Sequence, residues 1–267
     1  MTAINKFNIL FFSIFLIVVS SCTLNHAKID NDLKKYFDSS KVEGCFAILN
    51  NQMGDITVYN MELDTQRLPA GTSFKIPETL IGIQTGKITN ENTTLLTDSS
   101  ADGNPTLKAA FAKTSIPYFQ ELARQIGKEN FQAWLDSLSY GNKKMSSAVD
   151  SFWLNDELKI SPDEQLGFLS KLYFEQLPFQ KYSQQTVANL MLQEDDSLYR
   201  LSYATGTGID EKNNSIAWNL GWIEENRHIY FFVTFIRTPD KELDEESAVI
   251  KISKSCLKSL GFFRGQK

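Results

Sequence analysis

Hydrophobic and polar positions change their period along the chain, and the changes divide it into three stretches. Two short apolar runs, 44–49 and 56–59, flank the turn-rich segment 50–55, which is the pattern of a β-hairpin. From about residue 107 to residue 192 the apolar residues recur at helical spacing. Beyond residue 197 the pattern returns to that of strands.

These periods predict a set of elements and an architecture. Helices are expected over 76–84, 118–126, 131–138, 162–175, 183–192 and about 245–260, and strands over 199–204, 215–224 and 229–236, besides the hairpin. Strands at both ends with helices between them predict an α/β fold of the α+β type. In it, one antiparallel sheet is built from both termini, flanked by helices and interrupted by an inserted helical region. No linker-like tract or repeat divides residues 36–267, so we expect one domain there.

The first 21 residues have the pattern of a bacterial lipoprotein signal peptide. Lys6 supplies a positive start, residues 7–19 are mostly apolar, and small residues precede Cys22, which we expect to carry lipid after cleavage. A plain secretory signal or an uncleaved anchor are the alternatives. Residues 22–35 are expected to form a polar tether, so the protein would be exported and would face the periplasm from a bacterial membrane, held there by its lipid alone.

Charge and histidine content exclude several classes of function. The net charge is −5 with basic residues scattered throughout, which argues against a nucleic-acid surface. The acidic run 240–246 is interpreted as a solvated helix start. The chain has two histidines, His26 and His228, and no Cys/His cluster with metal-ligand spacing, so we expect no metal site.

Once Cys22 is assigned to lipid, Cys45 and Cys256 remain. An exported protein could pair them as a disulfide, which a first strand packed under a last helix would allow. Two buried free thiols are the equal alternative.

The segment 68–77 carries the candidate chemistry. Thr72 and Lys75 are three residues apart, which places their side chains on one helical face, whereas Ser73 is only two positions from Lys75 and points away. A threonine hydroxyl can serve as a nucleophile when a base lies beside it.

Further motifs follow this segment in order. They are Thr114-Ser115-Ile116, Tyr140-Gly141-Asn142, Asp150-Ser151-Phe152-Trp153-Leu154, Ala204-Thr205-Gly206 and Trp218-Asn219-Leu220-Gly221. Together with Thr72 and Lys75, in this order and spacing, they resemble the motifs of the class D β-lactamases and of the related penicillin sensor domains. The resemblance covers essentially the whole mature chain and implies a β-lactamase/transpeptidase-like fold.

The resemblance also implies roles for individual residues. Thr72 would attack a β-lactam carbonyl, Lys75 would act as general base with a carbamate from CO2, and Trp153 would support that carbamate. Phe74, Ile116 and Trp153 would keep the site dry. Thr114 would relay protons to the leaving nitrogen. Substrate contacts would come from Ile116, Thr205, Gly206 and Thr207, and the Thr207 amide would form an oxyanion hole with that of Thr72.

The chain departs from the family pattern at three reactive positions. Thr72 and Thr114 stand where the family has serine, and Ala204 stands where it has the lysine of a Lys-Thr-Gly strand. An arginine expected near residues 247–249 is also missing, and Arg237 is either its replacement or a surface residue. Loss of one charged hydrogen bond costs about 1.5–3 kcal/mol, so activity is expected to be reduced.

Three functions are therefore open. One is a β-lactam-recognising acyl-transfer enzyme of low turnover. Another is a lipid-anchored pseudoenzyme that binds a peptidoglycan stem peptide or a partner protein without chemistry. A penicillin sensor that is acylated but not turned over is the third.

Overall fold

The computed structural model describes residues 27–96 and 103–267. The predicted signal peptide, the predicted lipidation site Cys22 and His26 lie outside the described residues. Among the helices that are described, none combines the length and the apolar character needed to cross a bilayer.

In the described residues, seven strands form one sheet in the order β1-β3-β2-β9-β8-β7-β6, and two short strands form a second pair. The strands are β1 (Ala27–Ile29), β2 (Glu43–Asn50), β3 (Asp55–Tyr59), β4 (Leu68–Pro69), β5 (Lys159–Ile160), β6 (Leu192–Asp195), β7 (Tyr199–Ile209), β8 (Ser215–Glu225) and β9 (His228–Thr238). The sheet is antiparallel except where β1 pairs with β3. The predicted α+β architecture is confirmed.

The described helices are α2 (Lys34–Ser39), α3 (Met61–Thr65), α4 (Lys75–Gln84), α5 (Leu107–Lys113), α6 (Ile116–Ile126), α7 (Lys128–Leu138), α8 (Pro162–Tyr173), α9 (Lys181–Leu190) and α10 (Glu245–Ser259), with 3-10 turns η1 (Asn31–Leu33) and η2 (Gly71–Phe74). The helices α4 and α6 to α10 lie close to the predicted positions, whereas α2 and α3 were not predicted. The start of α8 is a capping box between Ser161 and Glu164.

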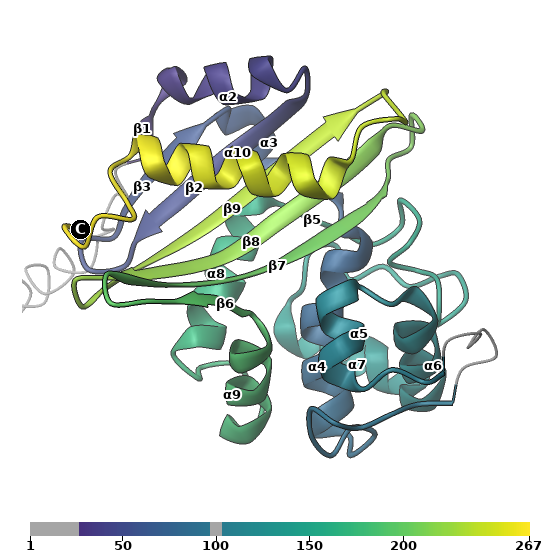
Figure 1. Cartoon of the computed structure of the whole chain (residues 1–267). Helices are drawn as coiled ribbons and strands as arrows, with labels where there is room; N and C mark the ends of the chain where they lie inside the picture. The colour runs from purple at the N-terminus through teal and green to yellow at the C-terminus, as the bar shows by residue number, and fades with distance from the viewer. Residues whose placement is uncertain (1–26, 97–102) are drawn as a thin grey trace, which may run out of the picture.

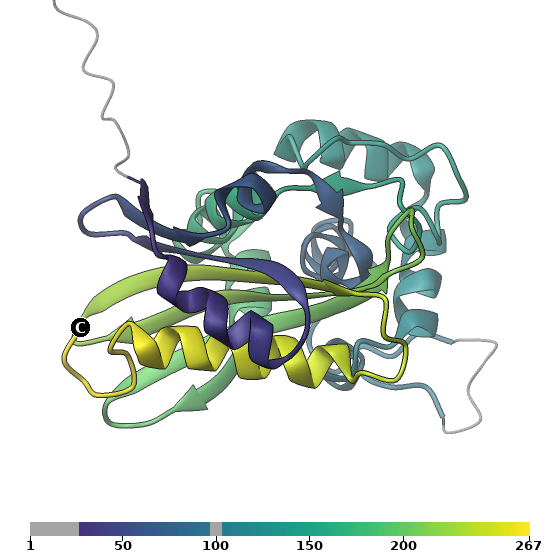
Figure 2. The same ribbon diagram turned by 90° about the horizontal axis from the view of Figure 1, so that it is seen from above.

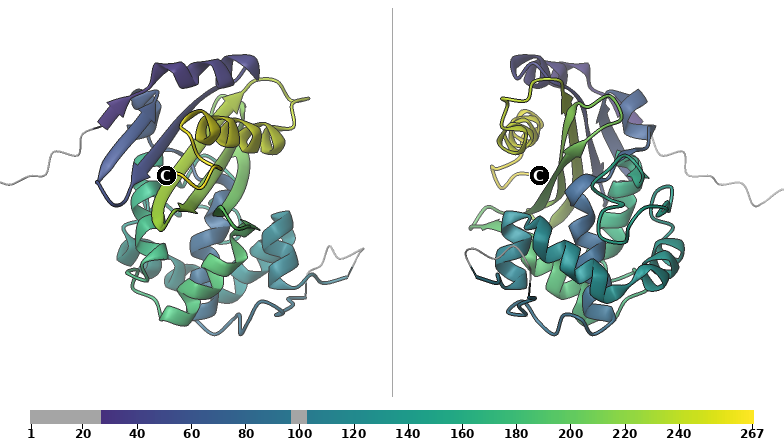
Figure 3. Two further views of the ribbon diagram at one scale, coloured as in Figure 1. Left: turned by 60° about the vertical axis from the view of Figure 1, so that its left-hand side comes forward. Right: turned by 90° about the vertical axis from the view of Figure 1, so that its right-hand side faces the viewer.

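The large sheet has a helical layer on each face. In Figure 1, α10 runs across the front of the sheet, while α4 to α7 lie below it and to the right. Figure 2 shows α2 beside α10 on one side of the sheet and the helical region on the other, and the right-hand view of Figure 3 looks along α10 almost end-on. Alternate residues of β2, β8 and β9 therefore enter two different cores, as the period-2 pattern requires.

The prediction of a tether over residues 22–35 is wrong for residues 27–35, which are the part of this segment that the structure describes. Ala27 to Ile29 pair in parallel with Ile56 to Val58 of β3. Leu33 and Phe37, which follow at i,i+4 spacing, are each 1% exposed and pack in the core under α10. Burial of these two side chains makes this segment part of the domain.

Cys45 and Cys256 are both buried free thiols, so the disulfide alternative is wrong. Cys45 belongs to the core on the helical-region side of the sheet, whereas Cys256 of α10 belongs to the core on the other side. The sheet itself separates them. Burial raises the pKa of both thiols, that of Cys256 to about 12.

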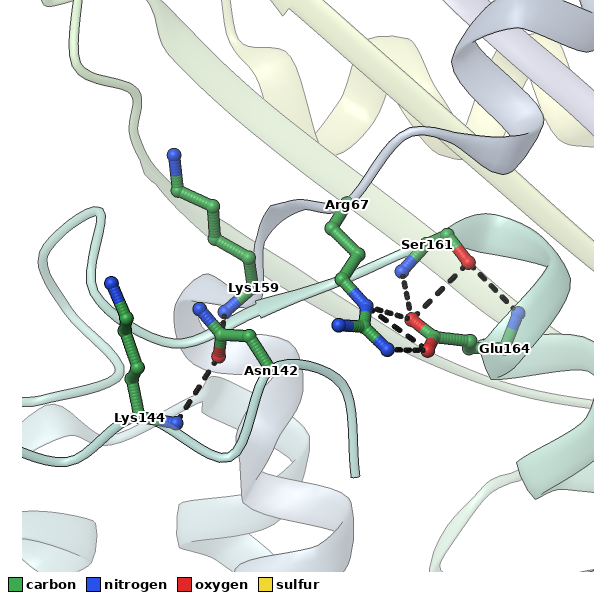
Figure 4. A network of polar contacts seen from close by, with 6 residues as sticks. All are labelled: Arg67, Asn142, Lys144, Lys159, Ser161 and Glu164. Carbon is green, nitrogen blue, oxygen red and sulfur yellow. Dashed lines mark hydrogen bonds and ion pairs between the residues drawn. The ribbon is translucent and has the colours of Figure 1, made fainter. Parts of the chain in front are cut away.

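A polar network fixes the chain on either side of the β4–β5 pair (Figure 4). The Arg67 guanidinium meets the Glu164 carboxylate, with Nη2 2.5 Å from Oε1, and the same carboxylate accepts from the Ser161 amide at 2.9 Å. Asn142 of the Tyr-Gly-Asn motif accepts from the Lys159 amide at 3.0 Å and from the Lys144 amide at 3.2 Å. This network holds the strand that leads directly into η2.

Asp64 of α3 is a buried carboxyl group without full hydrogen bonding. Asp64 is 4% exposed, and its Oδ1 has no hydrogen-bond partner among the described residues. Burial, and secondarily the charge of Asp163, raise the pKa of Asp64 to about 7. The group is therefore protonated in the native state at pH values where it is ionised in the unfolded chain.

We expect Asp64→Asn to remove a pH-dependent loss of stability. Between the unfolded pKa near 3.8 and the native pKa of about 7, the native state binds the extra proton, so stability falls as pH rises. The free energy of unfolding of the variant relative to that of the wild type, measured in urea, should rise by about 2–3 kcal/mol between pH 5 and pH 8. The control is Asp55→Asn, which removes an exposed carboxylate; an equal change in that variant would contradict the assignment.

Candidate functional site

The turn η2 and the start of α4 present the predicted Thr72 and Lys75. Ser73, between them, is fully buried and its hydroxyl donates to the Ala70 carbonyl at 2.6 Å. As predicted, Ser73 points away from Lys75. Its hydroxyl instead closes the turn through the hydrogen bond to Ala70. Tyr140 packs on Phe74 with ring centroids 5.8 Å apart, so the Tyr-Gly-Asn motif also supports this turn.

The Thr72 hydroxyl is held by the backbone of β7. Its Oγ1 accepts from the Thr207 amide at 2.7 Å and donates to the Thr207 carbonyl at 3.3 Å. The amide expected to serve an oxyanion hole therefore binds the hydroxyl of Thr72 in this state. A ligand oxygen must replace the hydroxyl before that amide is available.

Lys75 is a buried amine with a displaced pKa. The residue is 3% exposed, and Nζ donates to the Phe111 carbonyl at 3.0 Å and to Thr114 Oγ1 at 2.6 Å. Burial lowers the pKa of Lys75 to about 8, while the charge of Glu246 opposes this shift. A large fraction of the side chain is thus neutral at mildly alkaline pH, as a general base requires.

Thr114 lies within hydrogen-bond distance of Lys75. It terminates α5 in the left-handed region, with φ of 52°. A β-branched residue is disfavoured there, and the Ser115 amide holds the turn by donating to the Ala110 carbonyl at 2.9 Å. The strained turn aims the Thr114 hydroxyl at the amine.

Glu78 lies one turn after Lys75 on α4 and is fully buried. Neither of its carboxyl oxygens has a hydrogen-bond partner among the described residues. Burial raises the pKa of Glu78 well above its usual value, which favours the neutral form of the side chain. In that form Glu78 adds no negative charge that would favour protonation of Lys75.

The aromatic surroundings differ in part from those expected. Trp153 is buried and stacks on Phe74 with centroids 5.7 Å apart, which agrees with a dry setting for η2. Ile116 is 41% exposed at the start of α6, so the expectation that it keeps water from Lys75 is wrong. Phe111 does so instead, with its ring centroid 5.0 Å from Nζ.

Gly206 lets β7 approach η2 closely. A Cβ atom on Gly206 would lie 2.1 Å from the Ser73 amide nitrogen, a distance that only glycine avoids. Ala204, two residues before Gly206, is 4% exposed and contributes no charge. The Ala-Thr-Gly strand therefore keeps the backbone shape of the site without a cation.

Glu246 is the site residue that the sequence interpretation missed. Its carboxylate accepts a short hydrogen bond from the Thr205 hydroxyl. Both residues line a cavity of about 130 Å³, together with Lys75, Gln193, Tyr203 and Ala204. The interpretation of the acidic run as a solvated helix start holds for the helix cap Asp244, whereas Glu246 is half-buried and lines this cavity. A signal existed, because Glu246 shares a helical face with the buried residues Val249 and Ser253.

Arg237 does not join this site. Its guanidinium makes two hydrogen bonds with Glu43, at 2.7 and 2.8 Å, because the two residues are cross-strand partners on β9 and β2. It lines a different cavity, with Arg67 and Asp210. The proposal that Arg237 binds substrate at Thr72 is therefore wrong, and the surface alternative agrees with the structure.

Comparisons with known proteins agree on one family. Residues 34–258 match the model of the penicillin binding protein transpeptidase domain. The chain is 36% identical over 198 residues to the probable β-lactamase YbxI of Bacillus subtilis, which covers 72% of this chain and 73% of YbxI.

Two solved structures resemble the whole fold. The class D β-lactamase FUS-1 from Fusobacterium nucleatum subsp. polymorphum superposes with a TM-score of 0.82 at 28% identity, covering 90% of this chain and 100% of FUS-1. The C-terminal domain of the Bacillus licheniformis BlaR penicillin-receptor gives a TM-score of 0.84 at 26% identity, covering 90% of this chain and 98% of that domain.

The environment of Lys75 predicts an unusual titration. With lysines labelled at Cε, carbon NMR should show one resonance with a midpoint at a pH of about 8, which Lys75→Arg removes. Glu246→Gln should lower that midpoint further, since its charge raises the pKa of Lys75. The exposed Lys113 at the end of α5 provides the comparison within the same spectra. A Lys75 resonance that coincides with that of Lys113 would contradict the assignment.

Proposed function

Because the chain belongs to the penicillin-binding transpeptidase family, among class D β-lactamase-like proteins, we propose that it recognises β-lactams and transfers their acyl group slowly to Thr72. The observation that carries the proposal is the Lys75 amine, which is buried, displaced in pKa to about 8 and 2.6 Å from Thr114 Oγ1. A neutral amine in such a position is a base for a hydroxyl on the same helical face.

The proposed reaction forms one bond and breaks another. The Thr72 oxygen bonds to the β-lactam carbonyl carbon while the Thr72 proton passes to the neutral Lys75 amine. The ring carbon–nitrogen bond then breaks. The nitrogen receives a proton from the Thr114 hydroxyl, which recovers one from Lys75 over their 2.6 Å contact. Water, with Lys75 again as base, releases the acyl group from its ester with Thr72.

The same geometry supports the low turnover in this proposal. The hydrogen bonds between Thr72 and Thr207 must break before attack, and each contributes about 0.5–1.5 kcal/mol. Ala204 offers no cation to the carboxylate of a penicillin, and Glu246 opposes that carboxylate. A carbamate on Lys75 stays part of the proposal, since CO2 adds to a neutral amine, but Glu246 disfavours the added negative charge.

A non-catalytic binding function is the second candidate, and one observation favours it. The hydrogen bonds of Thr72 go to Thr207, while those of Lys75 go to Phe111 and Thr114, so nucleophile and base are not joined. In that case the protein would hold a peptidoglycan stem peptide or a partner protein in the same site without chemistry.

Acylation by benzylpenicillin distinguishes the two candidates. Intact-mass spectrometry should show one covalent adduct, and peptide mapping should place it on Thr72. Thr72→Val, which keeps the shape of the side chain and removes the hydroxyl, should give none. In the wild-type protein, the rate at which the adduct forms should rise with pH around a midpoint of about 8, as Lys75 loses its proton. Protein that stays unmodified at every pH, while still binding the drug, would support the non-catalytic candidate instead.

We also propose export and lipid attachment at Cys22. The support lies in the sequence: a positive start at Lys6, an apolar stretch over 7–19 and small residues before Cys22. The lipid would hold the domain at a bacterial membrane, facing the periplasm.

Metabolic labelling of the full chain with an alkyne fatty acid should place label on the wild-type protein and on Cys45→Ser, whose cysteine is buried in the sheet. Cys22→Ser should lose the label and leave the membrane fraction. Retained label in Cys22→Ser would refute the proposed attachment site.

A further inference from the structure

The strand β1 limits how far the folded domain can lie from Cys22. β1 begins at Ala27, which pairs with Ile56 beside the turn between β2 and β3. An extended chain advances at most about 3.6 Å per residue, so Cys22 and Ala27 are no more than about 18 Å apart in any conformation of the residues between them. A lipid on Cys22 would therefore hold the start of β1 at the bilayer surface.

The start of β1 lies at the same end of the large sheet as three turns between strands. Asn50 pairs with Tyr230, which places the β2–β3 turn beside the β8–β9 turn. Tyr199 pairs with Glu225, so the β6–β7 turn lies at this end too. All three turns and the C-terminus are at the left in Figures 1 and 2. We call the part formed by turns 51–54, 196–198 and 226–227 the hairpin end.

Exposed apolar side chains gather at the hairpin end. Met53 is 70% exposed in the β2–β3 turn, Leu198 is 50% exposed in the β6–β7 turn, and Phe174 is 40% exposed just after α8. Phe174 lines a surface hollow of about 430 Å³ together with Gln52 and Arg227 of two of these turns. Single exposed apolar residues are common on protein surfaces, but these three share the end that a lipid on Cys22 would hold at the bilayer.

The charged groups of the hairpin end are close to balance. Its basic residues are Lys28, Arg200, Arg227, Lys258, Arg264 and Lys267, and its acidic residues are Asp55, Asp195, Asp196, Glu224 and Glu225. Arg200 lies between two of these carboxylates, 3.4 Å from Asp195 and 3.6 Å from Glu224. This end therefore neither strongly attracts nor strongly repels anionic headgroups, and its apolar side chains are its main means of contact with lipid.

We propose that the hairpin end is a membrane-contact face. The lipid on Cys22 holds it against the bilayer, and Met53, Leu198 and Phe174 enter the headgroup region, where apolar side chains leave water. The inference goes beyond the proposed acyl transfer and rests on the proposed lipid attachment.

This orientation keeps the candidate site away from the bilayer. The strand β7 runs from Tyr199 at the hairpin end to Ile209 at the opposite end. Thr205 is six residues beyond Tyr199, which corresponds to roughly 20 Å along the strand. Ligands would therefore reach Thr72 and Lys75 from the aqueous side and not from the membrane surface.

Anchored protein in a defined bilayer tests the inference. The sulfur of Cys22 in the full mature chain is joined to a maleimide lipid in phosphatidylcholine nanodiscs. Cys45 and Cys256 are buried and should stay unmodified. A second lipid, whose headgroup chelates gadolinium, broadens the methyl resonances of groups that lie near the bilayer.

The methyl resonances of Met53 and Leu198 should be lost, whereas that of Ile209, which is also exposed but lies at the opposite end of β7, should remain. Met53→Ser combined with Leu198→Ser should weaken the broadening of the Ile56 methyl groups beside the β2–β3 turn. Ile209→Ser is the matched control and should leave that broadening unchanged.

Equal broadening of Met53 and Ile209, stronger broadening of Ile209, no broadening at all, or unchanged Ile56 broadening in the double variant would each overturn the inference. Failure of lipid attachment is separable, because the test supplies the lipid chemically. Absence of fatty-acid label on Cys22 in cells removes the attachment, whereas label on Cys22 with equal broadening removes only the contact face. A penicillin adduct on Thr72 is independent of both results.

Discussion

Burial of the Lys75 amine is the constraint around which the site is arranged. A charged lysine in an apolar interior is costly, so the side chain must either find acceptors or lose its proton. This protein does both in part: the Phe111 carbonyl and the Thr114 hydroxyl accept from Nζ, and the pKa falls to about 8. The left-handed backbone at Thr114 serves the same constraint, because it brings the Thr114 hydroxyl to the Lys75 amine at the expense of local strain.

A second dependence links the site to the far layer of the fold. The Ser253 hydroxyl lies 2.9 Å from Asn219 Nδ2 and 2.8 Å from Thr234 Oγ1, so α10 is joined by polar contacts to β8 and β9. That attachment fixes the first turn of α10 over β7, where Glu246 meets Thr205. One of the charged side chains that line the cavity, Glu246, is therefore positioned by a helix on the opposite side of the sheet from α4.

Sequence patterns predicted most of the fold because its long elements have strong periodicity. The hairpin, the three long strands and the helices from α6 to α10 were found near their expected positions. The strand β1 was missed because its three residues are all exposed and carry no pattern. Lys75 and Thr114, which the structure joins by a hydrogen bond, are both residues that the motifs indicate. The partner of Arg237 depends on the register between β2 and β9, which is a long-range property that local sequence does not encode.

Glu246 was not assigned to the site from the sequence for a different reason. Its spacing from Val249 and Ser253 indicates the inner face of α10, but acidic residues near a helix start have a sufficient local explanation in the helix dipole. From the sequence alone, an acidic residue at a helix start is therefore assigned to the helix dipole. Its second role in the cavity becomes visible only when its partner, Thr205, is known.

The two buried cysteines of the described residues can report on how the layers of this protein separate. Each thiol is enclosed in a different core, Cys45 toward the helical region and Cys256 under α10. Each therefore becomes reactive only when its own layer separates from the sheet. Alkylation of the two thiols would report separately on detachment of α10, which carries Glu246, and on loosening of the layer that encloses Lys75. The molecule thus contains an internal reporter for each half of its site.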